Sequence, residues 1–151
     1  MELMDVIRAR RAYRSLGPSA LGEEQARELA AAASLAPSCF NKQPWRFVFA
    51  YEKDVLEKLL RAMSKGNEWT RAASLIVAVC SRRDLDCVVK EREYYLFDSG
   101  MATAFLILCA TGMGLVAHPI AGYDEGAARA ALGIPADMTV ITLVVVGSHV
   151  L

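Results

Sequence analysis

A short proline-containing loop between a helix-like and a strand-like segment most constrains how this chain can fold. Residues 36–47 read Ala-Pro-Ser-Cys-Phe-Asn-Lys-Gln-Pro-Trp-Arg-Phe. Proline lacks a backbone donor and fixes φ, so Pro37 and Pro44 cannot both lie inside regular structure. The sequence therefore predicts a rigid polar loop held between two packed elements. Loops of this kind carry function more often than cores do.

Two amide side chains give this loop a capacity for recognition. Asn41 and Gln43 offer donors and acceptors that suit the edge of a heterocycle. The alternative is an ordinary turn that joins a helix to a strand, with Trp45 as a core anchor. The spacing alone leaves both interpretations open.

Apolar periodicity predicts helices and strands that alternate along the chain. We expect helices at 1–11, 23–35, 54–63, 93–111 and 124–132, strands at 46–51, 74–80, 112–117 and 140–146, and an ambiguous charged segment at 84–92. The apolar run at 74–80 indicates a strand covered on both faces. The alternation is typical of an α/β layered domain. Since no linker is long enough to divide residues 1–151, a single domain is expected.

Composition narrows the classes of protein. The net charge is zero, from 17 basic and 17 acidic residues, which argues against general nucleic-acid binding because that needs a basic field. The four cysteines show no CxxC or other metal spacing, and no metal is expected. Hydrophobic residues make up 54% of the chain, which points to apolar surface that a monomer cannot bury and hence to a homo-oligomer. The alternative is simply an alanine-rich sequence.

One uncharged stretch, residues 99–123, is long enough to cross a bilayer. Its threonine, proline and glycine residues favour instead a buried helix followed by a buried strand. The N-terminus lacks the basic region and apolar core of a signal peptide. A cytoplasmic protein with reduced thiols, and without a membrane partner, is the expectation.

Arginines gather near the start of the chain. Arg8, Arg10, Arg11 and Arg14 fall within seven residues at the end of the first expected helix. Guanidinium groups bind phosphate oxygens through paired hydrogen bonds. The alternative is a solvated helix end, where cations are favoured by the helix dipole.

A second candidate segment is Gly114–Gly122, which we expect to leave a strand into a Pro-x-x-Gly turn before a helix. Such turns expose backbone N–H groups and allow a flat ligand to approach closely, although a plain strand-to-helix loop is the alternative. His118 in this segment is expected to be packed or hydrogen-bonded rather than a base. No nucleophile–base set is visible, so an enzyme built this way would borrow its chemistry from a cofactor.

The chain resembles the nitroreductase family of FMN-dependent oxidoreductases from residue 7 to 147. Three motifs occur here in the order found in that family: the arginine segment, the Pro-Ser-x-x-Asn-x-Gln-Pro-Trp loop and the Pro-Ile-x-Gly segment. The resemblance implies an α+β layered sandwich with a central mixed, mainly antiparallel sheet flanked by helices. It also implies a homodimer with FMN at the subunit interface. NAD(P)H would be the co-substrate, and nitroaromatics, quinones or related acceptors would be reduced by a ping-pong hydride transfer. FMN would carry the chemistry, with no catalytic side chain.

The resemblance also assigns residues to the cofactor. Arginines would hold the FMN phosphate, the Pro-Ser-x-x-Asn loop and the glutamine after it would reach the flavin of the opposite subunit, an asparagine would contact the pyrimidine edge, and the Pro-Ile-x-Gly backbone would lie against the ring. The matching residues are Arg10, Arg11, Arg14, Pro37, Ser38, Cys39, Asn41, Gln43, Asn67, Pro119, Ile120, Ala121 and Gly122.

Three departures from the family pattern lead to further expectations. Ala12 stands where a hydroxyl residue is common. The chain ends at Leu151, before the point where relatives supply a basic residue to the phosphate, and the region between Cys80 and Glu93 is short. We therefore expect a shallower pocket and weaker FMN retention. A flavin-binding protein with little turnover, or a dimeric interaction domain without cofactor, are the alternatives.

Overall fold

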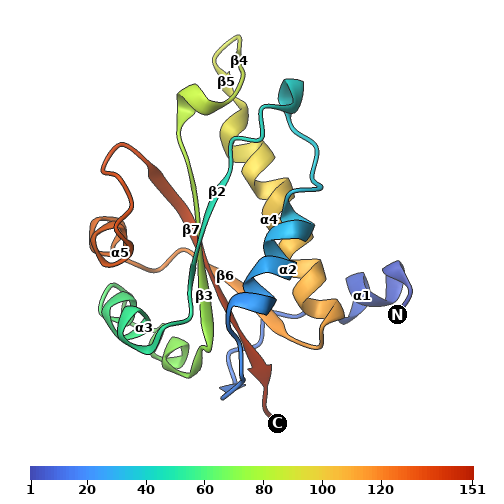
Figure 1. The fold of residues 1–151 in the computed structure, drawn as a ribbon, viewed down its shortest axis with the longest axis vertical. Helices are drawn as coiled ribbons and strands as arrows, with labels where there is room; N and C mark the ends of the chain where they lie inside the picture. The colour runs from blue at the N-terminus through green and yellow to red at the C-terminus, as the bar shows by residue number, and fades with distance from the viewer.

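The computed structural model describes residues 1–151 and shows one sheet covered by helices on both faces (Figure 1). The helices are α1 (Leu3–Ala9), α2 (Glu23–Ala33), α3 (Lys53–Leu60), α4 (Tyr94–Gly112) and α5 (Glu125–Leu132), with 3₁₀ turns η1 (Cys39–Asn41), η2 (Glu68–Ala72) and η3 (Arg83–Leu85). The strands are β1 (Leu16–Gly17), β2 (Arg46–Ala50), β3 (Leu75–Ser81), β4 (Val88–Val89), β5 (Arg92–Glu93), β6 (Val116–Ile120) and β7 (Thr139–His149).

The main sheet has five strands in the order β1-β7-β3-β2, and β6 pairs with β7 beside β1. All of its strand pairs are antiparallel. β3 lies between β2 and β7, and every one of its residues is buried. The predicted buried strand and the predicted α+β layers around a mainly antiparallel sheet are both confirmed.

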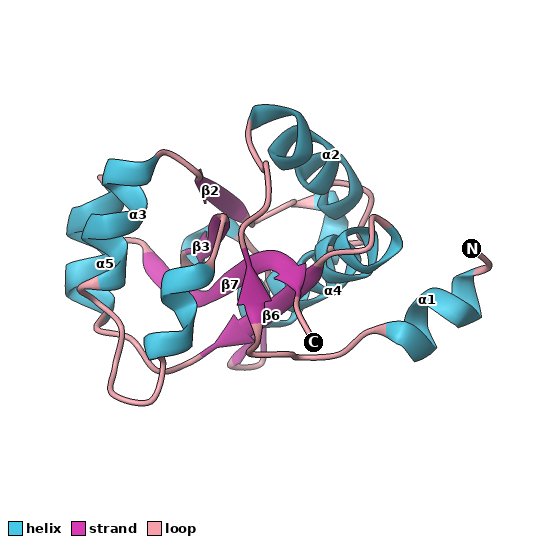
Figure 2. Ribbon diagram, turned by 90° about the horizontal axis from the view of Figure 1, so that it is seen from below, coloured by secondary structure: helices cyan, strands magenta, loops and turns pink.

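Side-chain alternation along β3 divides the core into two halves, because successive residues of a strand point to opposite faces. Val77 and Val79 pack with Leu29 of α2 and Leu106 of α4. The neighbouring residues Ile76, Ala78 and Cys80 pack with the α3 and α5 side chains Leu59 and Ala128. Figure 2 shows the resulting layers, with α3 and α5 on one side of the sheet and α2 and α4 on the other.

α4 is the one helix whose length and apolar composition would suffice to cross a membrane. In the fold it packs against α2, β3 and β6. It also buries Asp98 and Ser99 near its start and Leu106 and Ala110 further along. Core packing accounts for the buried face of this helix, as the sequence analysis expected, whereas Phe97 and Phe105 remain exposed.

The third expected strand was placed too early in the chain. α4 continues to Gly112, Gly114 then takes a left-handed φ of 77°, and β6 begins only at Val116. Pro119 and Ile120, expected in a turn, therefore lie in β6 opposite Val144 and Leu143. Proline is tolerated there because β6 is paired on one side only, so its missing N–H leaves no ladder partner unsatisfied.

Short elements also differ from the expectation. The ambiguous charged segment forms η3 and the β4–β5 hairpin, whose turn places Lys90 and Glu91 at φ 50° and 69°. β1 was not predicted, and its two residues give no periodic signal. The first helix is shorter than expected and ends at Ala9.

Candidate functional site

Arg8 lies in the last turn of α1, and Arg10, Arg11 and Arg14 follow the helix in an exposed stretch without regular structure. Arg11 donates to the backbone carbonyls of Arg8 at 2.5 Å and Arg10 at 2.7 Å. None of Arg10, Arg11 and Arg14 forms an ion pair with a carboxylate. The guanidinium groups of Arg10 and Arg14 are therefore free to bind an anion.

Aromatic contacts fasten this segment to the sheet. The backbone carbonyl of Tyr13 lies 3.1 Å from Nδ1 of His118 in β6. The Tyr13 ring stacks on His149 at a centroid distance of 3.7 Å. The ring centroid of His118 lies in turn 4.6 Å from that of Trp69 in η2, and the two ring planes are tilted by 32°. The arginines are thereby held beside β6 and close to η2.

Asn67, at the start of η2, is bound to the segment after β6. Its Nδ2 donates to the Gly122 carbonyl at 2.8 Å, and its Oδ1 accepts from Nε1 of Trp69 at 3.2 Å. A Cβ built on Gly122 would lie 2.6 Å from Nδ2 of Asn67, so only glycine permits this approach. The structure thus brings together three predicted groups: the arginines, Asn67 and Pro119–Gly122.

A cleft of about 210 Å³ opens beside Asn67, and its lining includes Lys65, Glu68 and Arg71. Backbone N–H groups of Glu68 itself and of Gly66 hold the pKa of the Glu68 carboxyl below its usual range. The carboxylate accepts from the Gly66 N–H at 3.0 Å. The cleft therefore carries one anionic and two cationic side chains, and it suits a polar ligand.

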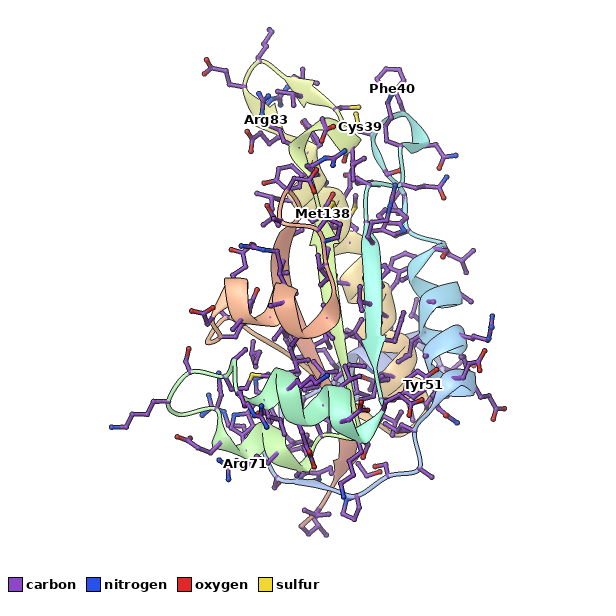
Figure 3. All side chains as sticks on the ribbon, turned by 60° about the vertical axis from the view of Figure 1, so that its left-hand side comes forward. Cys39, Phe40, Tyr51, Arg71, Arg83 and Met138 are labelled. Carbon is purple, nitrogen blue, oxygen red and sulfur yellow. The ribbon has the colours of Figure 1, made fainter.

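The Pro37–Gln43 loop lies at the other end of the sheet. Figure 3 shows Cys39 and Phe40 at the end of the molecule opposite to Arg71, which flanks the cleft. Within one chain, Pro37, Ser38, Cys39, Asn41 and Gln43 therefore do not join the arginines and Asn67. Their assignment to the flavin of an opposite subunit stays a prediction.

Hydrogen bonds hold the Pro37–Gln43 loop together, and its backbone is strained. Phe40, Asn41 and Gln43 have φ values of 50°, 53° and 48°, in the left-handed region that non-glycine residues rarely adopt. The Gln43 N–H donates to Oγ of Ser38 at 2.9 Å, and Nε2 of Gln43 donates to Oδ1 of Asn41 at 3.2 Å. The Cys39 N–H donates to Asp98 at 2.9 Å. Trp45 is buried in the core, as the alternative interpretation expected.

Sequence reasoning missed two residues that assemble the site, Tyr13 and Trp69. It did expect His118 to be packed or hydrogen-bonded, and the contacts with both residues agree. Tyr13 adjoins the arginines and Trp69 follows Asn67 closely in the chain. Nothing in the sequence pattern, however, indicates that they meet at His118.

Comparison with known proteins identifies the family of the chain. The sequence model of the Nitroreductase family matches residues 7–148. A protein of Archaeoglobus fulgidus named "Putative NADH dehydrogenase/NAD(P)H nitroreductase" is 29% identical over 150 residues, which cover 97% of this chain and 84% of the relative.

Two solved structures share the fold. A nitroreductase family protein from Clostridium novyi NT superposes with a TM-score of 0.91 at 23% identity, covering 99% of this chain and 86% of the other. A structure described as an oxidoreductase containing FMN superposes with a TM-score of 0.84 at 29% identity, covering 96% and 76% of the two chains. The chain belongs to the nitroreductase family, a family of oxidoreductases.

The close approach of Gly122 to Asn67 can be tested by stability. We expect Gly122→Ala to lower the free energy of unfolding by roughly 0.5–1.5 kcal/mol, because the new methyl group displaces the hydrogen-bonded amide. Gly126 in α5 is the matched control, since a Cβ there meets only an ordinary contact at 3.6 Å. Gly126→Ala should raise stability by roughly 0.5–1 kcal/mol. Urea unfolding measures the free energy of unfolding of both variants. Equal changes in the two would contradict the close approach of Gly122 to Asn67.

Proposed function

We propose that this chain binds FMN and uses NAD(P)H to reduce small acceptors such as nitroaromatics or quinones. Membership of the nitroreductase family and the name of the Archaeoglobus fulgidus relative support the reductase activity. The 29% identical oxidoreductase that contains FMN supports the cofactor.

The observation that carries the proposal is the set of guanidinium groups without acidic partners. Arg10 and Arg14 are exposed, unpaired with carboxylates, and fastened next to β6 through Tyr13. A phosphate is the ligand that such a set of donors suits best. The residues present therefore fit the phosphate end of FMN.

The remaining contacts suit the ring end of the cofactor. Asn67 uses one amide hydrogen for the Gly122 carbonyl and keeps a second donor for a ligand. Pro119 and Ala121 are exposed, whereas the Ile120 side chain is buried. We infer that this segment offers its backbone and the Pro119 and Ala121 side chains, and that Ile120 anchors it to the core.

When bound, FMN supplies the hydride chemistry, and the protein supplies binding and orientation. In this proposal Arg10, Arg11 and Arg14 neutralise the phosphate charge. Asn67 and the backbone near Gly122 would hold the ring. No side chain of the site would be required to act as a nucleophile.

A second copy of the chain would complete the site. Figure 2 shows α1 projecting from the body of the molecule, and α1 buries none of its residues. Leu3, Met4 and Ile7 of α1 are 66%, 52% and 41% exposed, and Phe97 and Phe105 of α4 are 62% and 41% exposed. Apolar surface of this extent is typical of a protein interface. A homodimer would cover this apolar surface. It would also bring the partner's Pro37–Gln43 loop, called the η1 loop because it contains η1, to the flavin.

Loss of one arginine should weaken FMN binding. We expect Arg14→Ala to cost roughly 1.5–3 kcal/mol of binding free energy, about 10–150-fold in Kd, because a charge-assisted phosphate contact is lost. Arg27, an exposed arginine of α2 paired with Glu23, is the matched control. Equilibrium fluorescence titration with FMN measures both, and unchanged affinity in Arg14→Ala would refute the phosphate assignment.

Anaerobic mixing tests the activity itself. We expect the absorption of protein-bound FMN to bleach when NADH or NADPH is added, and to return when a quinone or nitroaromatic follows. Stopped-flow absorbance records both phases. A protein that holds FMN but does not bleach would be a flavin-binding protein without turnover, and a protein that takes up no FMN would be an interaction domain.

The predicted dimer interface has its own test. We expect Ile7→Glu to convert dimers to monomers, because it buries an unpaired carboxylate in the apolar contact. Lys58→Glu, on the exposed surface of α3, is the control and should leave the mass unchanged. Sedimentation velocity distinguishes the two states, and a wild-type chain that is monomeric at all concentrations would exclude the interface.

A further inference from the structure

A compact group of metal-binding side chains lies at the end of the sheet where the η1 loop is found. Cys39 of η1 meets Asp86 and Cys87, which connect η3 to β4. The two sulfurs and a carboxylate oxygen all lie within 4.8 Å of one another. The three residues come from two segments that are distant in sequence, so the fold alone creates the group.

The Asp86 carboxylate provides an independent indication of a ligand. Asp86 is only 9% exposed. One oxygen, Oδ1, accepts from the Cys87 N–H at 2.7 Å, whereas Oδ2 is buried without any hydrogen-bond partner. Leaving a buried acceptor without a partner is unfavourable. A cation beside the two sulfurs would satisfy it.

Acidic groups crowd together around this cluster. Burial, followed by the neighbouring Asp98, raises the pKa of Asp86 to about 6. Contact with Cys39, together with partial burial, raises the pKa of Cys87 to about 11, and the cation Lys42 only partly opposes this. Asp86, Asp98, Cys39 and Cys87 thus lie close enough to oppose one another's ionisation.

We propose that Cys39, Asp86 and Cys87 form a binding site for Zn²⁺. Two thiolates and a carboxylate are a ligand set that zinc accepts, and hard cations such as Mg²⁺ and Ca²⁺ avoid the sulfurs. Tetrahedral coordination with Zn–S bonds of ~2.3 Å needs sulfurs ~3.8 Å apart, which the observed limit of 4.8 Å allows. Water takes the fourth position.

Asp98 supports the site from the start of α4. It is 1% exposed, and its Oδ2 accepts the Cys39 N–H at 2.9 Å. It therefore fixes the backbone that presents the first thiolate, as outer-shell carboxylates commonly do in zinc sites. Zinc at this position would join the strained η1 loop to the β4–β5 hairpin, a structural role separate from hydride transfer.

Zinc titration of the reduced full-length protein tests the site. We expect competition with a chromogenic chelator to show one Zn²⁺ bound per chain. Co²⁺ in its place should give a thiolate-to-metal charge-transfer band. Cys87→Ser and Asp86→Asn should each weaken Zn²⁺ binding by at least ~10-fold, the lower range of the losses caused by outer-shell changes. Cys109→Ser, in α4, is the matched control and should bind as the wild type does.

A measurement on the wild type keeps the test valid if a variant misfolds. Zn²⁺ should protect Cys39 and Cys87 from iodoacetamide, read by peptide mass spectrometry, and should leave the alkylation rate of Cys109 unchanged. Absence of Zn²⁺ uptake by the reduced protein would overturn the proposal. So would Zn²⁺ affinity that is equal in folded Cys87→Ser, Asp86→Asn and wild type. A Cys39–Cys87 disulfide with no zinc uptake after reduction would assign the pair to redox chemistry instead.

Discussion

β3 pairs with β2 on one side and with β7 on the other, and all seven of its residues are buried. A strand with two apolar faces needs a helical layer on each face, which fixes the places of α2 and α4 on one side and of α3 and α5 on the other. The two ends of this strand then separate the functional loops. η2 leads into the start of β3 beside Gly122, whereas η3 follows its other end near the η1 loop.

Elements with a strong local signal could be predicted from sequence. β3 is a continuous apolar run, and α5 has an N-cap in Asp124 and a left-handed Gly133 at its end, so both were expected nearly where they occur. β6 was placed too early because its length depends on pairing with β7, a contact between distant segments. The β4–β5 hairpin and β1 have only two residues per strand, too few for periodicity to reveal.

The candidate site, too, could be predicted from sequence only in part. Arg10, Arg14 and Asn67 stood out by residue type and family pattern, and the fold places their segments next to one another. The contacts that fasten them, from Tyr13 to His118 and from His118 to Trp69, join residues far apart in the chain and left no trace in the spacing. The group of Cys39, Asp86 and Cys87 was missed for the same physical reason. Metal patterns such as CxxC place potential ligands on one local segment, whereas these three side chains converge only after folding.

α1 has a consequence for how the chain becomes ordered. A helix of seven residues is too short to be stable in water by its own hydrogen bonds, and α1 has none of the buried side chains that stabilise α2 and α4. Within one chain α1 meets α4 without burying a side chain. In the proposed homodimer a second copy would cover α1, and folding of the N-terminus would then be coupled to association. By mass action, the apparent thermal midpoint of such a chain rises with its own concentration.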